Sequence, residues 1–402
     1  MKGETRNGGA VFYACFEDLT QEVAWTVHIR GVVNNWVAMG SAVILFCPSI
    51  FPFKFPPNSK VVYVPTVNVR IVGEYLYLLL LPFYILLWGI KERPKALYCR
   101  EMSLMIFLFL ACKIIRVPMI IEVNGFLFDE MKLIGASSFK SMIFRIFQWI
   151  NFNIAHDLVF VAAGLAEKYK KLYNLETEKM YVVPNGVDTD LFSPGDRDAA
   201  IENIIENGPF KLNPKSRYIT FVGSFYPHSL TPIIVEAARH VAQERDDVVF
   251  LMIGDGHDLP LCRKIVDENK LNNRVLFLDV RPHSEIPDYI RISSVLLYIT
   301  GASPEWRSSF KILEYMSSGG AAISNLELIF GVPLTHNKNY FFIEEPTPKL
   351  LSNAIIELID NDKLRKVIGQ GARELIVENF SWRKTAERLL YVIDGVIDGG
   401  GK

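Results

Sequence analysis

The sequence predicts an α/β protein of two Rossmann-like domains, each built on a doubly wound parallel sheet. Near-continuous apolar strands alternate with helices through most of the chain, which is typical of parallel sheets covered on both faces. One charged stretch rich in Asp, Asn, Pro and Gly, residues 189–215, interrupts the alternation and is interpreted as the linker. The length of 402 residues also fits two domains better than a single core.

The first half is expected to form a sheet with helices on both faces. Its first strand, 11–16, leads through a polar loop into a helix over 23–39, which Gly40-Ser41 ends. Pro48 and Pro118 mark further boundaries, because proline continues neither a central strand nor a helix. The remaining strands are expected at 42–47, 61–64, 96–99, 119–123, 158–161 and 179–183, and the helices at 71–90, 103–116, 139–154 and 164–173.

The second half restarts the same alternation after the linker. The expected strands are 218–222, 248–253, 275–278, 295–300, 321–324 and 340–343. The expected helices are 232–244, 258–270, 285–293, 309–318, 349–360, 361–378 and 381–393. Two such halves facing a cleft are the natural architecture for this pattern.

Composition excludes several classes of function. A net charge of −1 argues against a broad basic surface for nucleic acid. The five cysteines are scattered and lack C-x-x-C spacing, which argues against a disulfide framework or a zinc site. It also favours a reducing compartment, so we expect a cytoplasmic location. The polar opening, MKGETRNGGA, is not typical of a signal peptide.

Residues 75–90 form an uncharged run with two interpretations. The run is shorter than the about 20 residues of a spanning helix, and Pro82 interrupts it. It is either a core helix packed on the sheet or a helix lying in a membrane interface. Tyr75, Tyr77, Tyr84 and Trp88 would be the interfacial aromatic side chains in the second case.

Residues 299–325 complete one strand–loop–helix–strand unit, and ligands bind such units at the carboxyl ends of their strands. The first helical turn offers the backbone N–H groups of Ser309, Phe310 and Lys311 to a phosphate. Glu314 follows within reach, where its carboxylate would accept hydrogen bonds from sugar hydroxyls. The alternative for Lys311 and Glu314 is a solvated charge pair on a helix surface.

Six segments, in order, resemble the family 4 glycosyltransferases, which are retaining enzymes of the GT-B fold. The similar segments are MIIEVNGFLFDE (119–130), YVVPNGVDTDLFSP (181–194), FVGSF (221–225), FLMIGDG (250–256), SSFKILEYMSSGGAAISN (308–325) and GARELIVENFSWRKTAERLL (371–390). The resemblance spans essentially the whole chain. It implies a nucleotide diphosphate sugar as donor, UDP- or GDP-linked, with no catalytic metal and no other cofactor.

The resemblance also implies a domain plan and a class of acceptor. Residues 1–188 would form the acceptor-side domain, 189–215 the linker, 216–378 the nucleotide-sugar domain, and 379–402 a helix closing back toward the first domain. A glycan or lipid-linked acceptor is implied, in polysaccharide or glycolipid synthesis. Residues 75–90 would then give peripheral contact with the inner face of the cytoplasmic membrane.

Glycines in two turns are candidates for contact with the donor. Gly223 and Ser224 follow a strand, where a residue without a Cβ lets backbone approach a diphosphate; the alternative is a tight turn. Gly254, Asp255 and Gly256 end the next strand and allow the same two interpretations. In the family the segment matching 281–286 passes the nucleobase through backbone contacts.

Glu314 matches the second glutamate of the family's Glu-x7-Glu pattern, which resembles a clamp on ribose. The first glutamate should stand where this chain has Trp306, and Glu305 lies one position too early. Either a bulge brings Glu305 to the donor sugar, or that glutamate is absent.

The chain departs from the family at two other places. The usual Arg and Lys that neutralise the leaving diphosphate are Ser224 and Ser229 here. His228 and Arg307 are the candidates to supply that charge. Asn124 stands where many relatives have His, and its amide can bind a hydroxyl but cannot act as a base.

These departures keep two rivals to a glycosyltransferase open. One is a non-catalytic protein of the same fold that binds a glycan or a partner. The other is a sugar-nucleotide epimerase. Two polar residues of the first domain have structural interpretations: Glu122, inside an apolar strand, is expected to pair with a neighbour, and His28 is either a packing residue or a diphosphate contact.

Overall fold

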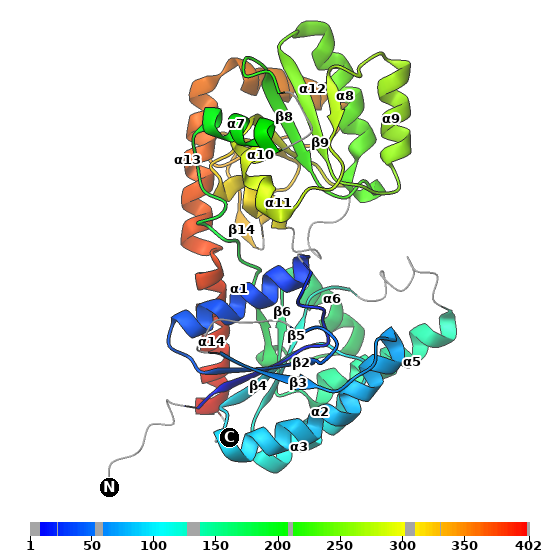
Figure 1. Cartoon of the computed structure of the whole chain (residues 1–402), viewed down its shortest axis with the longest axis vertical. Helices are drawn as coiled ribbons and strands as arrows, with labels where there is room; N and C mark the ends of the chain where they lie inside the picture. The colour runs from blue at the N-terminus through cyan, green and yellow to red at the C-terminus, as the bar shows by residue number, and fades with distance from the viewer. Residues whose placement is uncertain are drawn as a thin grey trace. The chain divides into compact units, whose positions relative to one another are not determined.

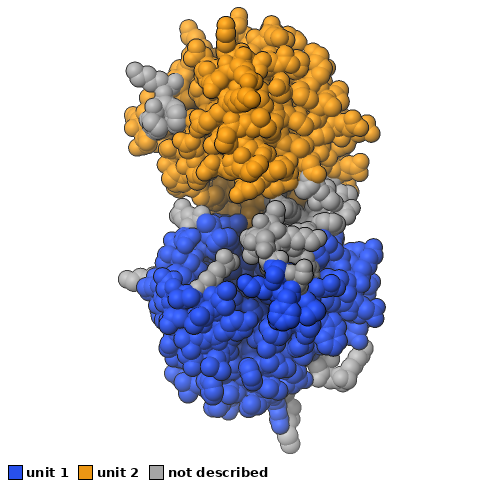
Figure 2. Space-filling model, turned by 90° about the vertical axis from the view of Figure 1, so that its right-hand side faces the viewer, with its two compact units in different colours: residues 1–185, 305–308, 382–402 blue, residues 186–304, 309–381 orange. Residues whose placement is uncertain are grey.

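The computed structural model describes residues 9–21, 23–52, 59–126, 137–207, 212–301, 310–329 and 331–399. The chain divides into two compact units, coloured separately in Figure 2. Among the described residues, unit 1 contains those up to Asn185 and those from Trp382 onward. Unit 2 contains the described residues from Gly186 to Ser381. Each unit has its own parallel sheet, which confirms the predicted α/β fold class.

Unit 1 is built on a seven-stranded parallel sheet in the order β3-β2-β1-β4-β5-β6-β7. The central strands are apolar and buried along their whole length, because helices cover both sheet faces (Figure 1). The strands are β1 (Val11–Ala14), β2 (Val43–Pro48), β3 (Ser59–Val64), β4 (Ala96–Arg100), β5 (Met119–Val123), β6 (Asp157–Phe160) and β7 (Met180–Val182).

The helices of unit 1 pack in two groups. Helix α1 packs along α14, while α2 packs along α3 and α3 packs against α5. The helices are α1 (Ala24–Ala38), α2 (Arg70–Glu92), α3 (Ile106–Ile115), α5 (Ser138–Ile154), α6 (Ala163–Tyr173) and α14 (Trp382–Gly399). A Cβ at Gly31 of α1 would lie 2.3 Å from Cδ2 of Trp382, so this glycine allows α14 to pack closely.

Unit 2 has a six-stranded parallel sheet in the order β10-β9-β8-β11-β12-β15 and a small antiparallel hairpin. Its strands are β8 (Arg217–Val222), β9 (Val248–Ile253), β10 (Val275–Phe277), β11 (Ser293–Tyr298), β12 (Ala322–Ser324), β13 (Leu328–Ile329), β14 (Val332–Pro333) and β15 (Phe341–Phe342). Its helices are α7 (Arg197–Asn207), α8 (Thr231–Glu244), α9 (Leu259–Glu268), α10 (Ile286–Ile292), α11 (Phe310–Ser317), α12 (Pro348–Asp360) and α13 (Asp362–Asn379).

The stretch interpreted as a linker, 189–215, contains helix α7 in the structure. Ala200, Ile201 and Ile204 of α7 are buried and belong to the core of unit 2, where the helix packs against α10. These apolar positions repeat at helical spacing, but the surrounding Asp, Asn and Glu residues obscure the pattern in the sequence. The antiparallel hairpin of β13 and β14 was likewise not predicted from the sequence.

A buried polar cluster in unit 1 joins β5 to α1 and to Asn185. Glu122 of β5 is 1% exposed, and its Oε1 lies 2.7 Å from Nε2 of His28 on α1. Tyr98 donates a hydrogen bond of 2.7 Å to the same carboxylate, and Nδ1 of His28 lies 2.6 Å from Oδ1 of Asn185. The prediction that Glu122 pairs with a neighbour is therefore confirmed. His28 is a buried member of this pair and packs edge-on against Trp382.

The pKa of the Glu122 carboxyl reflects these contacts. Burial alone would raise it, but the charge and hydrogen bond of His28, with Arg100 and Tyr98, lower the pKa from 4.5 to about 2. Because the pKa is lower in the folded state, the ionised carboxylate stabilises the protein at pH values above the pKa that the group has in the unfolded chain. That contribution is lost as the pH falls through about 2.

We expect Glu122→Gln to lower the free energy of unfolding at pH 7 by about 3 kcal/mol, because it leaves His28 buried without its carboxylate. The variant should also lose the fall in stability that the wild type shows between about pH 4.5 and pH 2. Urea titrations across this pH range measure both effects. Glu92→Gln, which breaks the more exposed contact with Lys60, is the matched control and should cost less than about 1 kcal/mol. Parallel stability curves for wild type and Glu122→Gln would contradict the assignment.

Candidate functional site

The candidate residues of unit 2 lie at the carboxyl ends of its parallel strands, here called the sheet edge. Its strands are parallel, so the loops after β8, β9, β11 and β12 all begin at the same side of the sheet. The sequence-predicted glycines follow β8 and β9, and α11 connects β11 with β12. The topology therefore brings three separate predicted segments to one place.

The loops after β8 and β9 touch backbone to backbone. Gly254 has a φ of +131°, and a Cβ there would lie 1.8 Å from the carbonyl oxygen of Gly223. Gly223 N–H donates to Ile253 at 2.8 Å, and Phe225 N–H donates to the carbonyl of Asp255 at 2.9 Å. Only a residue without a side chain fits at Gly254, so the geometry of the turn alone explains why this position is glycine.

Lys311 lies directly over this bare backbone. A Cβ at Gly223 would be only 2.3 Å from Nζ of Lys311, so the ammonium occupies the space that a side chain would take. The hydroxyl of Tyr315 accepts a hydrogen bond of 2.7 Å from the N–H of Val222, which fixes α11 against the end of β8. An ammonium, an uncovered glycine and the start of a helix together form an environment that attracts an anion.

Tyr315 is suited to this anchoring role because it stays uncharged. Its side chain is fully buried, and burial raises the pKa of its hydroxyl well above the ordinary value. The neutral hydroxyl keeps both a donor and an acceptor for the backbone of Val222. Lys311, four residues earlier on the helix, is thereby held over Gly223.

Glu314 has a partner that the sequence analysis missed. Its Oε1 lies 2.8 Å from Nε2 of His283, in the loop before α10. Glu314 is 6% exposed, so this histidine serves as the hydrogen-bond donor that a nearly buried carboxylate needs. The two residues are 31 positions apart, and nothing in the local pattern links them. The sequence signal was that His283 lies in the segment 281–286, which the family resemblance places along the nucleobase through backbone contacts, without a role for this side chain.

The ring of Phe192 packs against the imidazole of His283. The ring of Phe192 is fully buried, and its centroid lies 5.1 Å from that of His283. The Ser317 hydroxyl donates to the carbonyl of Phe192 at 2.7 Å, and Arg373 donates to the same carbonyl at 3.0 Å. Ser317 ends α11, so the helix that carries Glu314 is joined to the segment after Asn185 by these bonds.

The remaining loop after β8 turns toward the end of β11. The carbonyl of His228 accepts from the N–H of Gly301 at 2.9 Å and from the Thr300 hydroxyl at 3.1 Å. The imidazole of His228 stacks on the ring of Tyr226. Ser224 is half-buried in the same loop. The structure thus fixes the His228 backbone at the sheet edge that carries Gly223.

Asn124 belongs to unit 1, directly after β5, and is half-buried. The adjacent carbonyl of Gly125 accepts a hydrogen bond of 3.2 Å from Tyr169 of α6. Three predicted site residues, Glu305, Arg307 and Ser309, lie outside the described residues. Among those that the structure describes, no group of three His, Cys, Asp or Glu side chains is arranged to hold a metal ion.

Two known families match this chain along its length. Residues 204–375 match the family described as glycosyl transferases group 1, and residues 26–191 match glycosyltransferase family 4. The first match lies within unit 2 and contains the glycines, Lys311, Glu314 and His283. The second covers most of unit 1, including Asn124.

Curated relatives are similar at a lower level of identity. A D-inositol 3-phosphate glycosyltransferase of Corynebacterium glutamicum is 26% identical over 227 residues, covering 54% of this chain and 52% of that protein. A UDP-Gal:α-D-GlcNAc-diphosphoundecaprenol α-1,3-galactosyltransferase of Escherichia coli is 25% identical over 315 residues, covering 75% and 76%. The chain spans about half the length of the first relatives that it matches.

Solved structures share the fold over nearly the whole chain. HepE of Anabaena, in complex with UDP, has a TM-score of 0.70 at 12% identity, covering 96% of this chain and all of that one. WaaG, a glycosyltransferase involved in lipopolysaccharide biosynthesis, has a TM-score of 0.66 at 13% identity and similar coverage. With two family matches in sequence order and this fold, the chain belongs to the family 4, group 1 glycosyltransferases of the GT-B fold.

Proposed function

We propose that the protein is a retaining glycosyltransferase that moves a sugar from a nucleotide diphosphate sugar to an acceptor hydroxyl, in polysaccharide or glycolipid synthesis. The observation that carries this proposal is the position of Lys311 over Gly223, with Glu314 one turn further along the same helix. One helix thus offers a cation for a diphosphate and, three residues later, a carboxylate for ribose hydroxyls.

The donor would lie across the sheet edge of unit 2. Gly223 and the first N–H groups of α11 would bind the diphosphate, with Lys311 neutralising part of its charge. Glu314 would accept from the ribose hydroxyls through the oxygen that His283 leaves available. UDP is bound in HepE and is part of the E. coli relative's donor, which favours a UDP-sugar over a GDP-sugar here.

The transfer step needs stabilisation of the leaving diphosphate. The bond between the anomeric carbon and the donor phosphate breaks, and a bond from that carbon to the acceptor oxygen forms on the same face. The acceptor's proton passes to the departing phosphate oxygen, so the protein need not supply a base. Lys311 would hold the developing charge, and His228 and Arg307 are proposed as further contributors. Glu305 is proposed to contact the donor sugar, and Asn124 the acceptor.

A lipid-linked glycan is the proposed acceptor. The E. coli relative is named for transfer to a diphosphoundecaprenol-linked sugar, and WaaG is described as involved in lipopolysaccharide biosynthesis. Such acceptors have a soluble sugar and a chain that stays in a bilayer. We therefore propose a cytoplasmic protein that is peripheral on the inner face of the cytoplasmic membrane, with residues 75–90 in contact with the lipid.

Removing the Glu314 carboxylate tests the ribose contact. We expect Glu314→Ala to weaken UDP binding by about tenfold or more, because one charge-assisted hydrogen bond contributes about 1.5–3 kcal/mol. Isothermal titration with UDP measures the affinity, and transfer from a panel of nucleotide sugars measures the reaction. Glu374→Ala, an exposed carboxylate on α13 that bonds Gln370, is the control. Unchanged binding and transfer in Glu314→Ala would refute this role.

The diphosphate contact is tested at Gly223 and Lys311. A methyl at Gly223 displaces the Lys311 ammonium, so we expect Gly223→Ala and Lys311→Met each to weaken UDP binding by about tenfold. Neither should weaken uridine binding as strongly, because uridine has no phosphate. Lys349→Met, on an exposed lysine of the same unit, should bind UDP like the wild type. Equal losses for uridine and UDP would place the defect outside the diphosphate contact.

The rival functions give different readouts. A wild-type protein that binds none of UDP, GDP or ADP in calorimetry would favour a non-catalytic binding protein. Release of a free epimerised sugar from the donor, without a glycoside product, would favour an epimerase. Formation of a glycoside with the donor's anomeric configuration supports the retaining transferase.

A further inference from the structure

Helix α2 exposes a continuous apolar stripe. Its inner face is buried: Tyr77, Leu81 and Ile85 are fully covered, and the Tyr77 hydroxyl donates to the carbonyl of Phe46 in β2. Its outer face repeats large apolar side chains every three or four residues, so they lie along one side of the helix. The exposed residues are Ile71, Val72, Tyr75, Leu79, Phe83, Leu87 and Ile90, each between 47% and 74% exposed.

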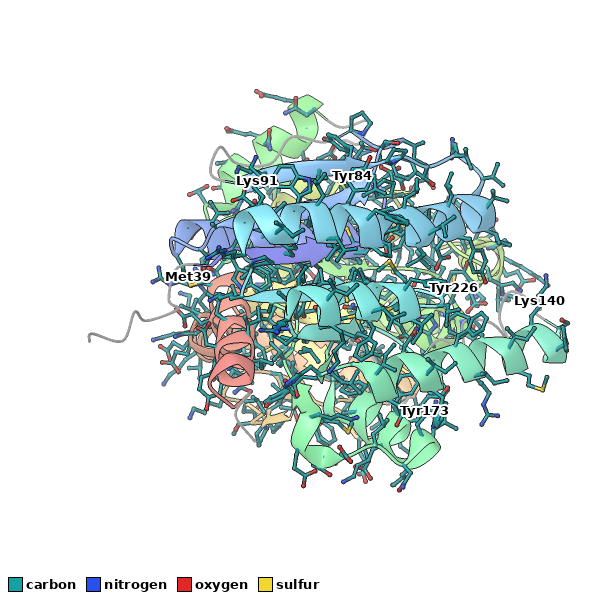
Figure 3. All side chains as sticks on the ribbon, turned by 90° about the horizontal axis from the view of Figure 1, so that it is seen from below. Met39, Tyr84, Lys91, Lys140, Tyr173 and Tyr226 are labelled. Atoms are coloured by element: carbon teal, nitrogen blue, oxygen red, sulfur yellow. The ribbon has the colours of Figure 1, made fainter. Side chains whose placement is uncertain are left out.

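Two neighbouring helices continue the stripe. Helix α3 lies beside α2, and α5 lies beside α3, as Figure 3 shows from below, with Lys91 near one end of α2 and Lys140 near the opposite end of α5. The exposed apolar residues on α3 are Phe107, Leu110 and Ile114, and those on α5 are Phe139, Met142, Ile146 and Trp149. More than half of the large hydrophobic side chains that are exposed in the described residues lie on these three helices. We call this surface the apolar face.

Hydrogen bonds hold the three helices as one platform. Glu74 of α2 accepts from the N–H and the hydroxyl of Ser103, just before α3. Asn151 of α5 accepts from the N–H of Met105 at 2.9 Å and donates to the carbonyls of Met102 and Ser103. The apolar face is therefore built on helices whose relative positions are fixed by buried polar contacts.

Among the described residues of α2, α3 and α5 and of their ends, the exposed charged side chains are basic. The three helices contain two acidic residues, Glu74 and Glu92, and both have partners within unit 1. The basic side chains at the ends and flanks of the helices are exposed: Lys91, Arg93, Lys113, Arg116, Lys140 and Arg145. An apolar surface bordered by cations is suited to the headgroups of anionic lipids.

The packing of α2 decides between a helix that spans a bilayer and one that lies on it. By length and composition, α2 is the single described helix that could cross a membrane. Its inner face, however, covers the sheet, and a Cβ at Gly89 would lie 2.5 Å from Ile115 of α3, so the two helices are closely packed. A spanning helix would have to leave these contacts. The geometry suits insertion of one face only.

We propose that the apolar face, formed jointly by α2, α3 and α5, docks the protein on an anionic lipid bilayer in the plane of the membrane. The proposal rests on the membrane association proposed above, extends it from residues 75–90 to three helices, and names the charge of the lipid. It does not depend on the transfer reaction. Vesicle binding and UDP binding are separate measurements, so failure of one is distinguishable from failure of the other.

Sedimentation with lipid vesicles tests the docking surface on the full chain. We expect the protein to pellet with vesicles that contain about one third phosphatidylglycerol, and at least about tenfold less with pure phosphatidylcholine. Raising the salt to about 0.5 M should reduce this preference, because screening weakens the contribution of the basic border. The double variant Leu79→Glu/Phe83→Glu should partition at least about tenfold less, since it places two charges in the inserted face.

Three further variants separate the contributions. Lys113→Glu/Lys140→Glu should lose the preference for phosphatidylglycerol. Ile114→Glu/Ile146→Glu should lose binding if α3 and α5 belong to the surface; normal binding would restrict it to α2 and overturn the three-helix proposal. Tyr391→Glu, on an exposed side chain of α14, is the matched control and should pellet like the wild type. All variants should bind UDP and unfold near the wild-type temperature, because every substituted side chain is exposed.

Three other results would overturn the proposal. Vesicle binding that is equal in the wild type and Leu79→Glu/Phe83→Glu would place the contact elsewhere. Protein that resists extraction from vesicles by alkaline carbonate would indicate a spanning helix. A dimer in analytical ultracentrifugation that dissociates in Leu79→Glu/Phe83→Glu, with no vesicle binding by the wild type, would assign the face to a second copy of the chain.

Discussion

The candidate site of unit 2 depends on the contact between Gly223 and Gly254. The loops from these adjacent parallel strands meet so closely that a Cβ at Gly254 would overlap the Gly223 carbonyl, while a Cβ at Gly223 would overlap the Lys311 ammonium. The contact leaves backbone uncovered at the sheet edge, and Lys311 takes the adjacent space. The hydrogen bond between Tyr315 and Val222 fixes the position of α11 relative to the end of β8, and this position determines where Lys311 and Glu314 lie. A few hydrogen bonds and two glycines thus set the geometry of the whole site.

Most of the fold followed from the sequence because parallel strands buried on both faces have an unmistakable apolar pattern. The strands over 119–123 and 248–253 agree with the prediction residue for residue. Helix α7 was missed because only a few of its positions face the core while charged residues fill the rest. Helix α14 runs to Gly399, beyond the predicted end at 393.

The site was predictable only in part. Gly223, Gly254 and Lys311 stand at strand ends or a helix start, where local pattern and the family resemblance both pointed, and the structure brings them together. The pairing of Glu314 with His283 depends on which strands are neighbours in the sheet, which a linear pattern does not encode.

The burial of residues 75–90 could not be predicted from the sequence either. An apolar run has one composition whether it is covered or exposed, and only the packing of α2 showed that one face is buried and the other is not.

The close fit of Trp382 against Gly31 has a consequence for how the chain is organised. The described part of unit 1 is discontinuous in sequence: its last helix arrives after all of the described residues of unit 2. This helix also accepts, at Ala386, the hydrogen bond of the buried Trp36 indole, and Thr385 bonds the carbonyl of Pro184. A fragment ending at residue 185 would leave Gly31 and Trp36 uncovered. Unit 1 is therefore completed only by a helix that follows unit 2 in the sequence, so its first 185 residues cannot reach their final packing before the whole of unit 2 has been synthesised.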